Sequence, residues 1–280
     1  MAVSELGDAL AAGGDVYASD DDPELVRAAS PFSLKLMESL LAEDPEHREL
    51  LLAAARGFTQ YSYAFVQEEA EETEETDRER SAALRERARR LYLRARDYGL
   101  RGLAVGHPGI AEELRREPRA SLTRTGTGDV PFLYWTAVSW ASAVSLSRDD
   151  PDLIGDLPII DALVERALVL EEDFGAGALH TFLITYDMSG PGGEKERAAR
   201  ARGRFDRAVE LSSGEQAAPF VALAEAVAVP AEDREEFRYL LNRALTIDPD
   251  EYPERRLANL IYQRRARRLL EREEELFLGP

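Results

Sequence analysis

The sequence predicts an all-α protein folded as one continuous helical domain over residues 1–280. Composition is the first observation, with 41 Ala and 37 Leu against 14 Val, 7 Ile and 10 Thr. Small and unbranched side chains lose little rotamer freedom in a helix, so this balance favours helices over strands. The second observation is that helix-forming stretches are separated by short Pro- and Gly-containing connections, without a flexible linker. Residues 1–14 are set apart, because we expect them to be disordered or to lie next to a tag.

The composition also excludes several classes of protein. The chain has no cysteine, so disulfides, thiolate metal sites and a thiol nucleophile are excluded. Its three histidines lie far apart in sequence and its formal net charge is −19. These features argue against a histidine-rich metal site and against a general nucleic-acid binder. The sequence carries no nucleophile elbow, phosphate-binding loop or zinc-peptidase motif. We therefore expect no catalytic activity, no metal and no cofactor.

Capping residues mark the helices of the first half of the chain. Three aspartates followed by Pro23 predict a helix start, and this helix should stop at Asp44–Pro45. A long helix should run from near Asp77 to Leu103, with Gly99–Gly102 marking its end. The acidic run 67–80 is interpreted as a solvated helix end or a loop. The other segments expected here are helices at 46–67 and 107–118 and a loop at 121–129.

The segment 130–147 is the most apolar part of the chain, with 18 residues and no charge. Its length makes it a marginal transmembrane candidate, but five hydroxyl side chains weaken that interpretation. Its aromatic side chains fall on all sides of a helical wheel, which is typical of a helix covered by its neighbours. We expect a central buried helix from Pro131 to about Ser147, bordering an internal cavity or pore. Further helices are expected at 156–172, 175–188, 194–212, 216–229, 232–247 and 252–274.

A spacing of small and aromatic residues recurs within these helices. An alanine is followed four residues later by an aromatic and three residues after that by a second alanine, at 88–95 and at 201–208. Looser copies end at Ala167 and Ala244. This spacing is typical of the second helix of a tetratricopeptide repeat, in which small residues let paired helices approach. The sequence thus predicts cryptic, degenerate tetratricopeptide-like helix pairs.

Two parts of the sequence are specific enough to compare with known families: DPELV and PFSLKLMESLL near the N-terminus, and DVPFLYWTAVSWA at 129–141. Together with segments that extend from about Asp15 to Leu278, they resemble the T components associated with TRAP transporters (the TatT family). It implies an all-helical, non-catalytic periplasmic lipoprotein that forms homotrimers. The implied partner is the periplasmic solute-binding P component of a TRAP system, and the implied solutes are hydrophobic compounds or organic acids held in an internal chamber.

The family's signal peptide and lipobox cysteine are not found in this chain. The resemblance therefore implies contact with the membrane only through a lipid anchor, if the full-length precursor carries one. A generic tetratricopeptide-like scaffold that binds a protein partner in a groove is the alternative function.

Candidate chamber residues are aromatic or polar side chains in apolar surroundings. Polar groups in such surroundings need hydrogen-bond partners or face a solute, whereas aromatics at helical spacing are more often part of a core. The candidates are Tyr61, Phe65, Tyr134, Trp135, Ser139, Trp140, His180 and Glu225.

Overall fold

The computed structural model describes residues 7–11, 13–147 and 149–277. Helix accounts for 81% of it, and the described residues form no strand, so the predicted all-α class is confirmed. The chain divides into two compact helical units. Unit 1 takes residues up to 14 and then 24–172, and unit 2 takes 15–23 and 173–280. The expectation of a single domain stays a prediction.

Unit 1 consists of helices joined by short turns. They are α3 (Pro23–Glu43), α4 (Arg48–Tyr61), the π-helix η1 (Ser62–Gln67), α5 (Glu68–Thr73), α6 (Arg78–Gly106), α7 (Ile110–Arg116), α8 (Pro118–Ser121), the 3₁₀ turns η2 (Leu122–Arg124) and η3 (Thr127–Asp129), α9 (Val130–Ser145), α10 (Pro151–Gly155) and α11 (Leu157–Leu170).

Unit 2 has the same character. Its elements are α2 (Gly14–Ala18), the 3₁₀ turn η4 (Phe174–Ala176), α12 (Ala178–Met188), α13 (Glu194–Leu211), α14 (Ala218–Leu223), the π-helix η5 (Ala224–Ala228), α15 (Arg234–Leu245), the 3₁₀ turns η6 (Pro249–Glu251) and η7 (Pro253–Arg255), α16 (Arg256–Glu271) and α17 (Glu273–Leu276).

Aspartates cap the starts of α6 and α15. Asp77 precedes α6 and accepts a hydrogen bond from the backbone N–H of Arg80 at 3.0 Å. Asp233 precedes α15 and accepts from the N–H of Glu236 at 2.9 Å. Each cap satisfies one of the amide groups that the first helical turn leaves without a partner. The predicted start at Pro23 and end before Asp44 agree with α3.

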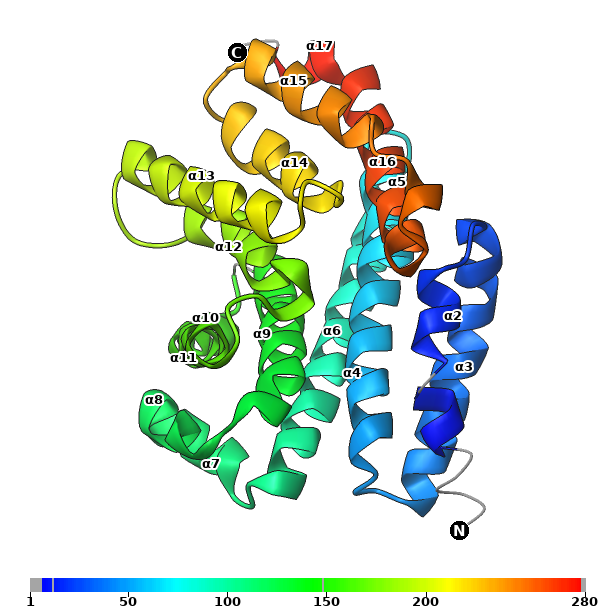
Figure 1. The fold of residues 1–280 in the computed structure, drawn as a ribbon, viewed down its shortest axis with the longest axis vertical. Helices are drawn as coiled ribbons and strands as arrows, with labels where there is room; N and C mark the ends of the chain where they lie inside the picture. The colour runs from blue at the N-terminus through cyan, green and yellow to red at the C-terminus, as the bar shows by residue number, and fades with distance from the viewer. Residues whose placement is uncertain (1–6, 12, 148, 278–280) are drawn as a thin grey trace. The chain divides into compact units, whose positions relative to one another are not determined.

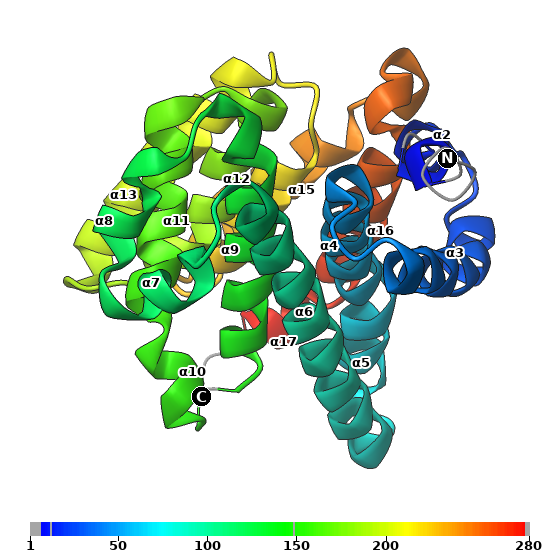
Figure 2. The ribbon, with the colours of Figure 1, turned by 90° about the horizontal axis from the view of Figure 1, so that it is seen from below.

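The predicted helix pairs are present within each unit. In unit 1, α6 packs on α4 and α11 packs on α9 (Figures 1 and 2). In unit 2, α13 packs on α12 and α15 packs on α14. The four alanines that end the repeated spacing, Ala95, Ala167, Ala208 and Ala244, are all completely buried. Small side chains at these positions let the helices of a pair approach closely, as the spacing predicted.

The predicted long helix to Leu103 agrees with α6 to within three residues, but Gly99 and Gly102 do not end it, because α6 continues to Gly106. Both glycines are buried where α6 crosses α9. A Cβ atom on Gly99 would lie 2.1 Å from Oγ1 of Thr136, and one on Gly102 would lie 2.0 Å from Cε1 of Phe132. These two positions therefore require glycine because α6 and α9 pack closely there, and not because the helix ends.

The acidic run 67–80 is partly a helix end, as predicted, but its first part is α5 and packs on α6. Glu68 and Ala70 of α5 are buried, and Glu69 pairs with Arg27 of α3 and Arg80 of α6. The run therefore contributes an inward-facing side as well as a solvated one.

The expected central helix is α9. It packs against α4, α6 and α11, and nine of its 16 residues are buried. Among the described residues, no helix combines the length and the apolarity needed to cross a membrane.

Candidate functional site

One side of α9 is aromatic and only partly covered. Tyr134 and Trp135 are partly exposed, and their rings meet edge to face with centroids 4.9 Å apart. Val138 and Ala141 lie one and two turns further along and are also partly exposed. We call these four residues the α9 stripe. Because residues at this spacing share a helix side, the stripe offers a continuous apolar surface.

The opposite side of α9 belongs to the core. Trp140 is only 2% exposed, its indole N–H donates to Asp156 at 3.2 Å, and the guanidinium of Arg96 lies 4.9 Å from its ring. Ser139 is completely buried, and its hydroxyl donates to the carbonyl of Thr136 at 3.0 Å. Both side chains therefore have structural roles in unit 1, and a chamber role for them is untested.

The candidates Tyr61 and Phe65 lie at the junction of α4 with the π-helix η1. Their ring centroids are 5.8 Å apart, and the guanidinium of Arg87 lies 5.9 Å from the Tyr61 ring. At the other end of η1, Gln67 accepts a hydrogen bond from the hydroxyl of Tyr92 at 2.9 Å. The sequence predicted a continuous helix here, whereas π turns frequently occur at functional sites.

The two candidates in unit 2 are His180 and Glu225. His180 lies on α12 and is 4% exposed. Glu225 lies in η5, and its two carboxylate oxygens accept from the Nη2 and Nε atoms of Arg265 at 2.7 and 2.8 Å. The lone charge in an apolar stretch thus has the partner that burial requires. The other six candidates belong to unit 1, so a chamber lined by all eight stays a prediction.

Unit 1 also contains a buried ionic cluster around Asp129. Its carboxylate accepts from Nε2 of His107 and from the amide of Gly126, each at 2.9 Å, and it pairs with Arg48. Burial alone would raise the pKa of Asp129, but the Gly126 amide, His107 and Arg48 together hold this pKa below its usual value. Arg48 also stacks over Phe132 at 4.6 Å. The cluster ties the ends of α4 and α6 to the start of α9.

Asp8, His47 and Glu49 form the one group among the described residues with the composition of a metal site. Nδ1 of His47 caps α4 by accepting the N–H of Leu50 at 3.4 Å. In the neutral ring the proton then lies on Nε2, which faces Asp8 at 3.4 Å. A metal would have to displace that proton, so the geometry fits a helix cap better than a metal ligand.

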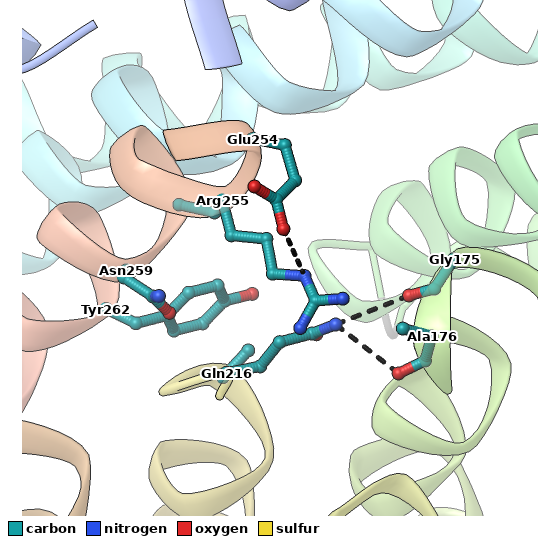
Figure 3. A pocket seen from close by; sticks show the side chains of 9 residues that line it. Gly175, Ala176, Gln216, Glu254, Arg255, Asn259 and Tyr262 are labelled. Atoms are coloured by element: carbon teal, nitrogen blue, oxygen red, sulfur yellow. Dashed lines mark hydrogen bonds and ion pairs between the residues drawn. The ribbon is translucent and has the colours of Figure 1, made fainter. Parts of the chain in front are cut away.

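A pocket with a volume of about 390 Å³ opens in unit 2 (Figure 3). It lies between the start of α16, the 174–177 turn and the start of α14. Its lining residues are Gly175, Ala176, Gln216, Ala218, Glu254, Arg255, Ala258, Asn259 and Tyr262.

The turn on one side of the pocket is held in an unusual conformation. Gly175, Ala176 and Gly177 all have positive φ, at 58°, 51° and 92°. Alanine rarely adopts this region of φ, so contacts from the surroundings have to stabilise the strained backbone at Ala176. Gln216 supplies such contacts, because its side-chain amide donates N–H groups to the carbonyls of Gly175 and Ala176 at 3.4 and 3.3 Å (Figure 3).

The opposite wall is formed by charged and amide side chains. Arg255 pairs with Glu215 through Nη1 and lies 3.6 Å from Glu254 through Nε. Asn259 is buried, accepts the N–H of Ala217 at 2.9 Å and donates to the carbonyl of Glu215 at 3.0 Å. These bonds fix α16 against the start of α14 and set the width of the pocket.

Sequence reasoning missed this pocket. Its residues come from segments about 40 positions apart, and none of them forms a motif. The sequence predicted only a short Gly-containing connection at this point and a last helix at 252–274. The charged groups that matter, Arg255 and Glu254, look like ordinary surface residues until the fold brings them beside the strained turn.

The structure defines an all-helical protein built of helix pairs, with a pocket in unit 2 and the partly exposed α9 stripe in unit 1. The family model described as "TRAP transporter T-component" matches residues 19–277. An uncharacterized protein of Treponema pallidum (strain Nichols) is 31% identical over 270 residues, which cover 94% of this chain and 83% of that protein. The chain therefore belongs to the TRAP transporter T-component family. Membership supports an accessory role in TRAP transport rather than an enzymatic one.

Proposed function

We infer that this protein is a periplasmic T component that binds the P component of its TRAP system and holds a hydrophobic or organic-acid solute in an internal chamber. The family match across residues 19–277 carries this proposal. The family's lipid anchor and homotrimeric assembly belong to the same proposal.

The α9 stripe supports a role in solute binding. An uncharged helix that leaves a tryptophan and a tyrosine partly exposed presents the kind of apolar surface that lines ligand sites. We assign the stripe, through Tyr134 and Trp135, as the part of the chamber wall in contact with the apolar portion of the solute.

Tryptophan fluorescence tests this assignment, because the chain contains only two tryptophans. Trp140→Phe leaves Trp135 as the single reporter on the stripe, and Trp135→Phe leaves the buried Trp140 as a matched control. Titration with a medium-chain fatty acid should shift the emission of Trp135 to shorter wavelength and leave that of Trp140 unchanged.

The partner is tested separately by co-elution with the P component encoded by the same system. A stable complex in size-exclusion chromatography is the expected result, and failure to co-elute would contradict the proposed partner.

In the fluorescence titration, equal emission shifts of Trp135 and Trp140, or no shift of either, would contradict the role of the α9 stripe as a chamber wall.

A further inference from the structure

We propose that the pocket of unit 2 binds a free α-amino acid in its zwitterionic form. The proposal concerns this pocket alone, and it does not require the ligand to be the solute that the transport system carries. Four features of the pocket support it: an available cationic donor, an excess of carboxylate, an apolar floor and rigid walls.

The donor is the guanidinium of Arg255. Its Nη1 is engaged by Glu215 and its Nε lies near Glu254, but Nη2 has no hydrogen-bond partner among the described residues. Figure 3 shows this guanidinium between Tyr262 and the 175–176 turn. Two N–H groups of Nη2 are thus available for a ligand carboxylate, for which a guanidinium is the preferred partner.

The charges around this donor select the ligand. Arg255 has two neighbouring carboxylates, Glu215 and Glu254, so the group carries a net charge of −1. A ligand with only a carboxylate would meet two like charges, and one with only an ammonium would meet the guanidinium. A zwitterion matches both signs, because its carboxylate can face Nη2 of Arg255 while its ammonium faces a glutamate.

Glu254 is the glutamate best suited to the ammonium. Its side chain is 65% exposed and lies 3.6 Å from Nε of Arg255, beyond hydrogen-bond distance, so it can turn towards a ligand at little cost. Glu215, in contrast, is held by its direct pair with Arg255. The amide oxygen of Gln216 accepts no hydrogen bond from the described residues and offers a second acceptor on the side of the strained turn.

The rest of the pocket suits an uncharged side chain. Ala176, Ala218 and Ala258 supply small apolar surfaces, and Tyr262 adds an aromatic ring to the lining. In Figure 3 this ring lies next to Asn259. The volume of about 390 Å³ is within the range of small-molecule sites. An aromatic or branched aliphatic amino acid therefore fits better than an acidic or basic one.

The walls are already in place without a ligand. Gln216 holds the strained turn, and the amide of Asn259 is bonded at both ends. Little ordering is needed when a ligand enters, which favours binding.

Isothermal titration calorimetry with three probes tests the charge argument on the unaltered protein. The probes are L-phenylalanine, 3-phenylpropanoate, which lacks the ammonium, and phenethylamine, which lacks the carboxylate. Phenylalanine should bind, and each singly charged analogue should bind at least about tenfold more weakly. No binding of phenylalanine up to about 10 mM, or equal binding of 3-phenylpropanoate, would overturn the proposal.

Variants then locate the site. Arg255→Gln should weaken phenylalanine binding at least about tenfold, and Glu254→Gln, at an exposed position, by about threefold. Arg267→Gln is the matched control, because Arg267 is an exposed arginine of α16, the helix that follows Arg255, and lies outside the pocket. This variant should bind phenylalanine as the parent protein does. Unchanged binding by Arg255→Gln would place the ligand elsewhere and refute the assignment. If Arg255→Gln does not fold, the three-probe comparison on the unaltered protein and the Glu254→Gln variant still test whether the pocket binds phenylalanine.

These results are independent of the proposed transport role. Phenylalanine binding without P-component binding would leave the pocket assignment intact and remove the accessory role. P-component binding without phenylalanine binding would remove the pocket assignment and leave the accessory role intact.

Discussion

Gly102→Ala is expected to destabilise unit 1, although the same change usually stabilises a helix. Alanine in place of glycine inside a helix contributes about 0.5–1 kcal/mol. In α6, however, the new Cβ would lie 2.0, 2.5 and 2.8 Å from three ring atoms of Phe132. Ordinary contacts begin at 3.4 Å, so the ring would have to move by more than an ångström.

Phe132 has little room to move. It is 2% exposed, and the guanidinium of Arg48 stacks on its ring at 4.6 Å. Overpacking of this kind costs about 1–3 kcal/mol and sometimes more. Because the clash involves three atoms of a confined ring, we expect about 3 kcal/mol, which leaves a net destabilisation of about 2 kcal/mol after the helix gain.

Urea unfolding followed by circular dichroism measures this difference. The control is Gly203→Ala in α13, where the added Cβ has no neighbour within 4 Å, and where we expect a stabilisation of about 0.5–1 kcal/mol. The second test is Gly102→Ala in a Phe132→Ala background. There the new methyl meets the space left by the ring, and the change should be neutral or stabilising. The close crossing of α6 and α9 would be refuted if Gly102→Ala stabilised the protein as Gly203→Ala does.

Two further predictions concern buried charges. Asp129→Asn should destabilise the protein by about 1–3 kcal/mol at neutral pH, because it removes the charge that His107 and Arg48 surround. The pKa of Asp129 is lowered in the folded state, so its stabilisation is present above the ordinary pKa of about 4 and is lost as pH falls through the lowered value. The melting temperatures of the two proteins should therefore converge as pH falls below the ordinary pKa of about 4, and a difference that does not change with pH would contradict the lowered pKa of Asp129. In unit 2, Arg265→Met should cost about 1–3 kcal/mol by leaving Glu225 without this partner, and adding Glu225→Gln should restore most of that loss, as a double-mutant cycle in urea would measure.

Local signals were sufficient to predict the helices and their pairing. Asp followed by Pro marks the start of α3, and the buried anchors Ala95 and Ala208 follow from their spacing to an aromatic. Both signals act over one or two helical turns, where chain neighbours are also neighbours in space. Predictions from these signals therefore do not depend on how the rest of the chain folds.

The features that were missed depend on tertiary contacts. Gly99 and Gly102 looked like a helix end, because a glycine's role as a packing contact is visible only when the facing helix is known. The π turns were equally hidden, since nothing in Ser62–Gln67 or Ala224–Ala228 departs from helical composition. The pocket was missed for the same reason, as its walls come from distant segments.

The division between what was predicted and what was missed has a physical basis. Small residues such as Ala95 and Ala244 bring paired helices into contact over their length and leave no room for a ligand between them. The pocket instead lies beside a connection that departs from helical geometry, because Gly175 and Ala176, both with positive φ, form part of its lining. Changes at the anchors should therefore act on stability, whereas changes at Arg255 and its surroundings should act on binding. In this protein the helix pairs supply a rigid frame, and the short connections between them carry the chemistry by which a ligand is selected.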